Sequence, residues 1–376
     1  MKPRINPFGV RDARVPYVWV LAPLIVLVLV AVVAWTSPWD SSEPGTAAGV
    51  EDTREPPDGT PAATASKNAA KQVSEKVATT TPDPTEAAVH PKLDRSMRRF
   101  VAAQTRLATR VGRQMKQREN QLAKRSQPVS FRVASYNVLG DSHTGPGGNK
   151  PGFPDGGPRM DMAISALRNN GIDVVGFQEF ESSQYAMFTS RAAEYSLYPG
   201  LSLGDKSVRF NIAWRSSMWR LVEGRSISIP YAGGSRIEMP VVLLESTLNG
   251  RRAWFANFHN PADTPNLGNN ARWRAEAAGI EVSYLTALHL EDGLPVIATG
   301  DYNERAEIFC RFTAGGVFSA AAGGSSAGGC APPASMQVDW IFGSTGVAFD
   351  SYAVTNTGNA SDHNLVHSGV TLLGDE

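Results

Sequence analysis

Between residues 128 and 376, short apolar runs repeatedly end on an acidic, amide or histidine side chain, and this pattern constrains the fold most. In chain order the six motifs are Ser135-Tyr136-Asn137, Phe177-Gln178-Glu179, Asn257-Phe258-His259, Gly300-Asp301-Tyr302-Asn303, Val338-Asp339-Trp340-Ile341 and Ser361-Asp362-His363. Four of the six end an apolar run of strand character, which places each polar group where a strand meets a loop. We therefore expect these side chains to face one edge of the sheets.

The same region predicts many short strands and few helices. Helices are expected over 160–170 and 270–290, and strands over 131–137, 172–178, 211–214, 219–222, 226–229, 241–246, 253–258, 295–299, 337–342, 347–354 and 365–372. Gly171 follows the first predicted helix, and glycine is common at the position just after the end of a helix. Many short strands with few helices favour an α+β domain over 128–376, with two sheets packed together and helices outside.

Charge is distributed unevenly along the chain. Residues 1–91 hold 8 Lys and Arg against 10 Asp and Glu, residues 92–127 hold 11 against 2, and residues 128–376 hold 17 against 24. The three net charges are therefore −2, +9 and −7, and they cancel over the whole chain. A generic nucleic-acid-binding surface is not expected on the acidic domain.

The N-terminus carries a membrane signal. Residues 17–35 are 19 residues without a charge, which is the threshold for spanning a bilayer. Basic residues predominate in 1–16, so the positive-inside rule predicts a cytoplasmic N-terminus, a transmembrane signal anchor over 17–35 and an extracytoplasmic remainder. The protein would then be a single-pass protein of the cell membrane. The alternative is a cleavable signal peptide, for which Val32 and Ala34 are small enough.

Two further segments precede the acidic domain. Residues 37–90 are rich in Pro, Ala, Thr and Ser and predict a disordered linker. Residues 91–127 predict a basic amphipathic helix, because apolar side chains recur three, four and seven positions apart while Arg and Lys fill the other faces. This helix either packs on the domain or self-associates, or residues 92–127 form an arm that binds a polyanion such as nucleic acid, anionic lipid or wall polymer.

Cys310 and Cys330 are the only cysteines of the chain. In an exported domain, two cysteines form a disulfide more often than a metal site. We therefore predict a disulfide that staples the intervening segment, which is rich in Gly, Ala and Ser.

The polar groups of the earlier strand ends suit metal-assisted hydrolysis of phosphate esters. That reaction requires neutralised phosphate oxygens, an oriented water and a stabilised leaving oxygen. Glu179 follows a buried apolar run, where a carboxylate needs a partner, and a hard cation such as Mg²⁺ is a natural one. Asn137 could help to hold the metal or a phosphate oxygen. The alternatives are a Glu at the start of a helix and an Asn in a turn.

The later strand ends supply candidate catalytic groups. Asp301 and Asn303 are two positions apart and would project to the same side of an extended chain, to orient water and bind phosphate, unless they form only an Asx turn. His363 titrates near neutral pH, and Asp339 is the carboxylate expected to fix its tautomer. His259 could offset negative charge or protonate the leaving oxygen, although a lone histidine of this kind is more often structural.

Taken together, these motifs resemble the endonuclease/exonuclease/phosphatase superfamily, with the fold of deoxyribonuclease I, over roughly residues 130–372. The resemblance implies a metal-dependent phosphoric ester hydrolase built as a four-layer α/β sandwich of two mixed sheets flanked by helices. It implies Mg²⁺ or Mn²⁺ as the cofactor. The implied metal-binding residues are Asn137, Glu179 and Asp362, and the implied catalytic residues are His259, Asp301, Asn303, Asp339 and His363.

The resulting prediction is an exported, membrane-tethered, nuclease-like phosphodiesterase with a phosphoester substrate, such as nucleic acid. The alternatives are a phospholipid or inositol-phosphate hydrolase and a non-catalytic surface binding module. Two features depart from the family pattern: Asn260-Pro261 follows His259, and the loop over 145–157 is glycine-rich. That loop lacks the Gly-Lys-Ser/Thr of a P-loop, and it either shapes the mouth of the site or is a disordered surface loop.

Overall fold

The computed structural model describes residues 95–266 and 268–374. The predicted cytoplasmic segment, signal anchor and linker, residues 1–16, 17–35 and 37–90, lie outside the described residues. Within the described ranges, no helix is both long enough and apolar enough to cross a membrane.

Two six-stranded sheets form the centre of the domain. In spatial order, the first sheet contains β11 (Val347–Thr355), β12 (Leu365–Leu372), β1 (Val129–Asn137), β2 (Val174–Gln178), β4 (Asn211–Arg215) and β3 (Tyr195–Tyr198). The second contains β5 (Trp219–Pro230), β6 (Arg236–Ser246), β7 (Arg252–His259), β8 (Val296–Asp301), β10 (Asp339–Ser344) and β9 (Phe318–Ala320). The pairs β1–β2 and β7–β8 are parallel and the other neighbours are antiparallel, so both sheets are mixed, as predicted.

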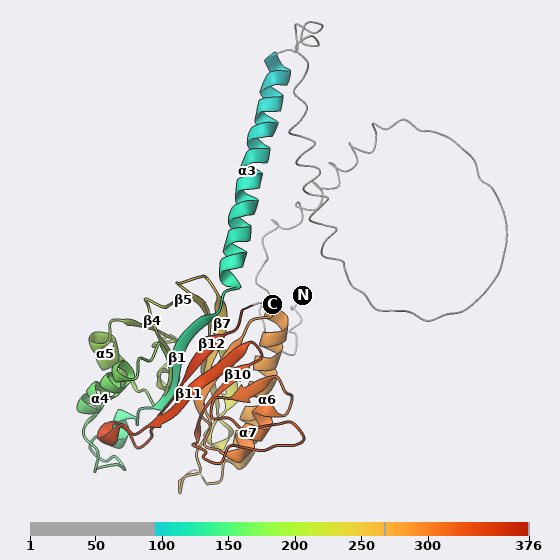
Figure 1. The fold of residues 1–376 in the computed structure, drawn as a ribbon. Helices are drawn as coiled ribbons and strands as arrows, with labels where there is room; N and C mark the ends of the chain where they lie inside the picture. The colour runs from blue at the N-terminus through green and yellow to red at the C-terminus, as the bar shows by residue number, and fades with distance from the viewer. Residues whose placement is uncertain (1–94, 267, 375–376) are drawn as a thin grey trace, which may run out of the picture. The chain divides into compact units, whose positions relative to one another are not determined.

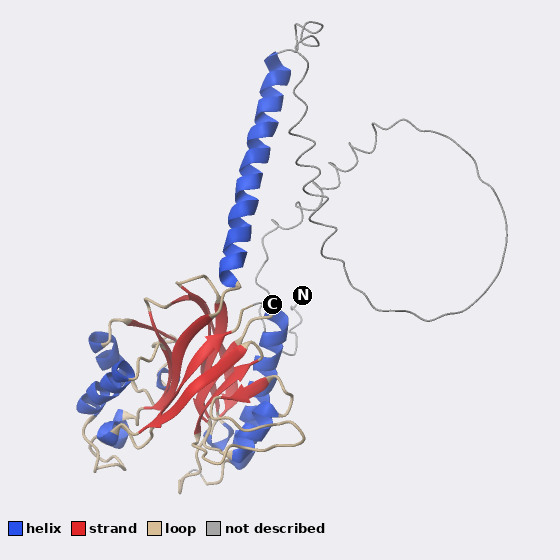
Figure 2. Cartoon of the chain, viewed as in Figure 1, coloured by secondary structure: helices blue, strands red, loops and turns tan. Residues whose placement is uncertain are grey.

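Helices cover the outer faces of both sheets (Figures 1 and 2). The first sheet carries α4 (Gly156–Asn169) and α5 (Ser182–Arg191), and the second carries α6 (Ala271–Asp292) and α7 (Ala306–Thr313). A separate hydrophobic cluster fills each of the three interfaces between these layers. Between the sheets, the ring of Phe131 packs edge-on against Trp219 and Phe255, at centroid distances of 4.9 and 5.8 Å. The predicted arrangement of two packed sheets flanked by helices is therefore confirmed.

The elements agree with the sequence pattern except where strands and helices are short or irregular. The helix predicted over 91–127 is described as α3 (Arg95–Arg125). The two strands predicted over 219–222 and 226–229 are wrong as separate elements, because β5 is one strand with a register shift between Leu221 and Glu223. A bulge of this kind interrupts the alternation of side chains without ending the strand. The strands β3 and β9 and the helix α7, which have between 3 and 8 residues, had no predicted counterpart. Helix α5 begins at Ser182, close to Glu179, where the start of a helix was the alternative to a metal-binding role.

The predicted disulfide is present. Cys310 in α7 is bonded to Cys330, with the two Cα atoms 5.4 Å apart. The bond ties the glycine-rich segment that follows α7 back to the helix.

Candidate active site

The ends of β1 and β2 supply the first two predicted residues. These strands are parallel, and their register pairs Asn137 with Gln178, so Glu179 leaves the sheet beside Asn137. Asn137 is fully buried. The parallel pairing explains the juxtaposition, because strands running in one direction end at the same edge of the sheet.

The second sheet aligns three more predicted residues across neighbouring strands. His259 at the end of β7 pairs with Asp301 at the end of the parallel strand β8. Asp301 also pairs with Asp339 at the start of β10, which runs antiparallel to β8. All three side chains belong to buried residues. A histidine and two carboxylates therefore meet at one edge, although they are far apart in the sequence.

Asn137 links the two sheets. Its Nδ2 donates hydrogen bonds to Glu179 Oε1 and to Asp301 Oδ2, each at 3.1 Å. Its Oδ1 accepts a hydrogen bond from the backbone N of Leu139 at 3.0 Å. In this orientation the amide nitrogen, not the amide oxygen, faces the two carboxylates, so Asn137 positions them.

Glu179 is held as an ionised carboxylate. Burial by itself would raise its pKa, but His143, His259 and hydrogen bonds from Gly140 and Asn137 outweigh burial and hold the pKa far below its ordinary value. His143 Nε2 lies 3.3 Å from Glu179 Oε2, and the backbone N of Gly140 donates to the same oxygen at 3.0 Å. The hydrogen bond with Glu179 is the main cause that raises the pKa of His143 to about 9.

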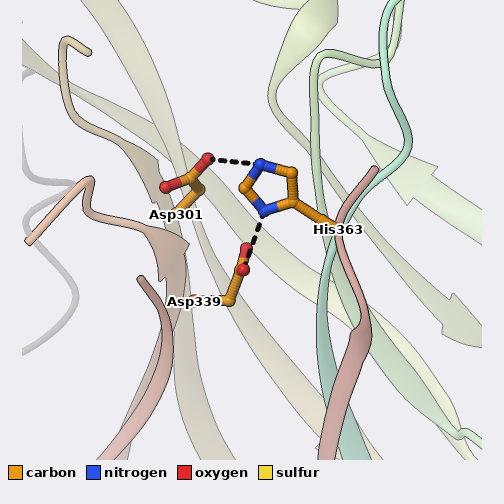
Figure 3. A group of neighbouring side chains, drawn as sticks. All are labelled: Asp301, Asp339 and His363. Carbon is orange, nitrogen blue, oxygen red and sulfur yellow. Dashed lines mark hydrogen bonds and ion pairs between the residues drawn. The ribbon is translucent and has the colours of Figure 1, made fainter. Parts of the chain in front are cut away.

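His363 lies between two carboxylates (Figure 3). Its Nδ1 is 2.8 Å from Asp339 Oδ2, and its Nε2 is 3.7 Å from Asp301 Oδ2. Burial alone would lower the pKa of His363, but Asp339 and Asp301 raise it well above its ordinary value. Burial also raises the pKa of Asp339, against the opposing effect of His363. The pair is therefore an imidazolium–carboxylate ion pair at neutral pH.

His259 approaches Asp301 from the other side. Its Nε2 is 3.5 Å from Asp301 Oδ2, and its ring packs edge-on against Phe210 and Tyr231 at centroid distances of 5.8 and 5.9 Å. Its Nδ1 is buried and has no hydrogen-bond partner among the described residues. Asp301 Oδ2 thus faces three nitrogen atoms, from Asn137, His259 and His363.

Asn303 supports Asp301 through its backbone. The backbone N of Asn303 donates to Asp301 Oδ1 at 3.0 Å, which is the Asx turn considered as an alternative. The Asn303 side chain donates from Nδ2 to the carbonyl oxygen of Asn260 at 2.8 Å. Asn303 therefore lies in the site, but its amide nitrogen is hydrogen-bonded to the loop that follows His259.

Asp362 lies at the exposed rim rather than in the buried network. Its Oδ2 is 2.7 Å from Lys150 Nζ, which comes from the glycine-rich loop. That loop has a defined conformation: His143 Nδ1 is 2.8 Å from Asn149 Oδ1, and a Cβ at Gly148 would come within 2.2 Å of His143 O. Of the two alternatives for the loop, the one in which it shapes the mouth of the site agrees with these contacts.

Sequence patterns assigned no role to Arg159 or to Ser361 of the last motif, although both support the site through main-chain atoms. Arg159 of α4 is buried and donates from Nη1 to the carbonyl oxygens of Val138 and Leu139 at 2.8 and 2.6 Å. Ser361 Oγ donates to the carbonyl oxygen of Asn137 at 2.7 Å. Because these partners are main-chain atoms, no residue type at positions 138 and 139 signals the contact. His143 was detectable in principle, as a histidine soon after the first strand.

Two sets of residues could hold a metal ion. Ligand atoms of Asp301, Asp339 and His363 lie within 4.8 Å of one another, but His363 Nδ1 is already engaged by Asp339. Glu179 and Asp301 instead offer carboxylate oxygens hydrogen-bonded to the same amide nitrogen. Mg²⁺ prefers oxygen ligands, so the chemistry of the donors around Glu179 fits Mg²⁺ better.

Fold, site and sequence together define the class of protein. The chain belongs to the endonuclease/exonuclease/phosphatase family, which it matches over residues 134–363, and it is therefore assigned to the phosphoric ester hydrolases. No curated protein sequence matches it significantly.

Solved structures with this fold include three from Bacteroides. A family member from Bacteroides thetaiotaomicron is 18% identical with a TM-score of 0.54, over 65% of this chain and 99% of that one. A mannosyl-6-phosphatase from the same organism is 18% identical with a TM-score of 0.52, over 64% and 99%. A family member from Bacteroides vulgatus is 16% identical with a TM-score of 0.50, over 64% and 98%. At these identities the likeness shows a shared fold.

Proposed function

We propose that the protein is an exported, membrane-tethered phosphodiesterase that hydrolyses phosphate esters with the help of Mg²⁺ or Mn²⁺. The observation that carries the proposal is one connected network of side chains, from Glu179 through Asn137 and Asp301 to His363 and Asp339. The network contains an ionised carboxylate, a water-orienting carboxylate and a protonated imidazole. Those are the groups that charge neutralisation and attack by water require.

The metal would be held by Glu179, with Asp362 at the rim, and Asp301 would act on the water rather than bind the metal. When bound, it would neutralise charge on the phosphate oxygens and make water a better nucleophile. Asn137 would keep the two inner carboxylates apart and correctly oriented through its amide nitrogen.

Asp301 would orient the attacking water and accept its proton. Its Oδ1 is fixed by the backbone N of Asn303, so the carboxylate cannot turn away. His363, kept protonated by Asp339, would donate a hydrogen bond to a phosphoryl oxygen and offset the charge that develops there. His259 would protonate the leaving oxygen, since its ring is held against Phe210 and has one nitrogen directed at Asp301.

Export is supported by the disulfide and by the uncharged segment over 17–35. Structural disulfides persist in oxidising compartments and are rare in the cytosol. A signal anchor would leave the catalytic domain outside the cytoplasm on a tether formed by residues 37–90.

Nucleic acid is the first candidate substrate, and two cations at the mouth favour an extended polyanion. Lys150 on the glycine-rich loop and His143 just before that loop flank the site, although the net charge of residues 128–376 is −7. Contacts with neighbouring phosphates strengthen binding to nucleic acid, so the loop would compensate in part for the acidic domain.

The test uses residues 92–376, which form one compact unit. The protein is incubated with bis(p-nitrophenyl) phosphate, plasmid DNA, sphingomyelin and inositol phosphates, each with Mg²⁺, Mn²⁺ or EDTA. His363→Ala should abolish metal-dependent cleavage of diesters. His289→Ala is the matched control, since His289 bonds Leu294 and Thr345 at the other end of β10.

Each outcome of this assay separates the candidates. Cleavage of DNA that is lost only in His363→Ala supports the nuclease-like activity. Preference for sphingomyelin or an inositol phosphate replaces it by the lipid or inositol-phosphate hydrolase. Failure to cleave any substrate by a correctly folded protein contradicts the proposal and favours a non-catalytic binding module.

A further inference from the structure

Helix α3 presents an apolar stripe to solvent. Every residue from 97 to 124 is exposed. Large apolar side chains on this helix retain about half or more of their exposure, including Phe100 at 59%, Leu107 at 57%, Met115 at 62% and Leu122 at 58%. Soluble proteins rarely expose a large contiguous apolar surface, and such a surface marks an interaction site.

Basic side chains occupy the face opposite this stripe. The helix contains ten Lys and Arg and one acidic residue, Glu119. With about 3.6 residues per turn, seven of the ten basic residues point away from the apolar side chains. These are Arg95, Arg98, Arg99, Arg106, Arg113, Lys116 and Lys124. A partner can therefore cover the stripe without meeting these seven charges.

The stripe is symmetric about Val111. Its successive positions are 100, 104, 107, 111, 115, 118 and 122, at intervals of 4, 3, 4, 4, 3 and 4 residues, which read the same in both directions. Two of the positions are polar, Gln104 and Arg118, and each is 7 residues from Val111. Only an antiparallel partner would place Gln104 opposite Arg118. A parallel partner in register would place each of these residues opposite its own copy.

We propose that two copies of this chain pair through α3 as antiparallel helices, with Val111 on the two-fold axis. Phe100 then packs against the partner's Leu122, and Leu107 against the partner's Met115. Gln104 faces the partner's Arg118, whose guanidinium donates to the amide oxygen. A symmetric pair of this type uses the same patch on both copies.

The charge pattern selects this orientation over the parallel one. A parallel pair in register would place Arg118 against the partner's Arg118 inside an apolar seam, where like charges repel and lose hydration. The antiparallel pair removes that contact and gives each Arg118 a neutral hydrogen-bond acceptor.

The anchoring of the helix leaves the stripe available. Its C-terminal end is fixed to the domain, since Arg251 Nη1 donates to the carbonyl oxygen of Arg125 at 2.8 Å and Asn249 Nδ2 donates to that of Gln127 at 3.1 Å. Arg125 is 14 residues from Val111, so the two anchored ends would lie about 42 Å apart along the axis, at about 1.5 Å per residue. The two catalytic domains would thus be attached at opposite ends of the pair.

A second copy fits the stripe better than an anionic lipid surface does. A helix that lies on a bilayer buries its apolar face among the lipids and keeps its charges on the polar face. In α3 the stripe itself contains Arg118 and Gln104, so a bilayer would have to bury a guanidinium without a partner, whereas a second copy supplies one. The pairing does not depend on the catalytic activity.

Cysteine crosslinking in the full chain tests the pairing. Single variants Val111→Cys, Phe100→Cys and Arg113→Cys are each treated with a short bis-maleimide, which spares the Cys310–Cys330 disulfide. Phe100→Cys is also mixed with Leu122→Cys on differently tagged chains. Arg113→Cys is the matched control, because it is close to Val111 along the axis but on the opposite face.

We expect Val111→Cys to crosslink and the mixture of Phe100→Cys with Leu122→Cys to form mixed dimers. Phe100→Cys alone should not crosslink, because two copies of residue 100 would be about 33 Å apart along the axis. Crosslinking of Phe100→Cys alone would indicate a parallel pair and overturn the proposal. Equal yields for Val111→Cys and Arg113→Cys would also overturn it, since random collision would then explain both.

Discussion

A carboxyl group buried behind the site should make the stability of the domain depend on pH. Glu281 of α6 is fully buried, and its Oε2 accepts a hydrogen bond from Asn260 Nδ2 at 3.4 Å. Burial is the main cause that raises its pKa from 4.5 to about 8. Glu304 raises the pKa further, while the bond from Asn260 and the charge of Arg311 lower it. Glu281 is therefore neutral in the folded protein at pH 7.

The sign of the effect follows from the direction of this shift. Because the pKa is raised on folding, the folded state retains a proton that the unfolded chain releases above pH 4.5. The stabilisation is complete below that pH and is lost as the pH rises toward 8. At about 1.36 kcal/mol per pKa unit, the loss is about 1 kcal/mol at pH 5 and about 4 kcal/mol at pH 8.

Glu281→Gln should abolish this contribution, because an amide keeps the acceptor for Asn260 and cannot ionise. The free energy of unfolding is measured by urea denaturation between pH 5 and pH 8. Between these limits, the wild-type protein should lose about 3 kcal/mol more than Glu281→Gln does. Glu276→Gln, on the exposed side of the same helix, should behave as the wild type.

Equal pH dependence in wild type and Glu281→Gln would refute the reasoning. It would mean that Glu281 is ionised when buried, and that a group or water compensates its charge. Because the carbonyl oxygen of Asn260 accepts from Asn303, a reorganised Glu281 would also disturb the active-site loop.

Four further outcomes are expected. Asp339→Asn should lower kcat by about 10²–10⁴-fold with little change in secondary structure by circular dichroism, because His363 loses the charge that keeps it protonated. Glu179→Gln should weaken Mg²⁺ binding by more than about 10-fold in titration calorimetry, and an unchanged affinity would exclude Glu179 as a ligand. Arg159→Met should cost about 2–4 kcal/mol in urea denaturation, because it removes a charged donor from the carbonyl oxygens of Val138 and Leu139, to which Gln184 Nε2 also donates, and from that of Pro154. Replacing Cys310 and Cys330 by Ser should cost about 3 kcal/mol for a sequence separation of 20, and a stability equal to that of the wild type would show that the bond is unimportant for folding.

The sequence predicted which residues meet, because each lies where a strand ends and the chemistry restricts the residue type. Asp301 illustrates the point: an aspartate directly after a buried apolar run has few structural reasons to be there. The sequence did not predict which neighbours Asp301 would have. The pairing of β8 with β7 on one side and β10 on the other depends on register, and register is set by the whole sheet.

The residues that escaped prediction act through main-chain atoms or belong to very short elements. Arg159 bonds to the carbonyl oxygens of Val138 and Leu139, and any residue type at those positions offers the same acceptor. Helix α7 has 8 residues and strand β9 has 3, which is too short for a period to be recognised. Their existence follows from packing, since Phe309 and Phe312 of α7 and Phe318 of β9 belong to one hydrophobic cluster.

The backbone of the site carries strain that the chemistry itself requires. Of the four non-glycine residues with positive φ among the described residues, Leu139, Glu179 and Asn303 lie at the site, with φ of 53°, 56° and 52°. Each costs about 1–3 kcal/mol, and glycine would avoid most of that cost. Glycine, however, offers no carboxylate at 179 and no side-chain amide at 303. The fold compensates locally at Leu139, where the N bonds Asn137 Oδ1 and the carbonyl oxygen accepts from Arg159. Because the bond from the Leu139 N also orients Asn137 between the two carboxylates, stability and function at this edge share a contact.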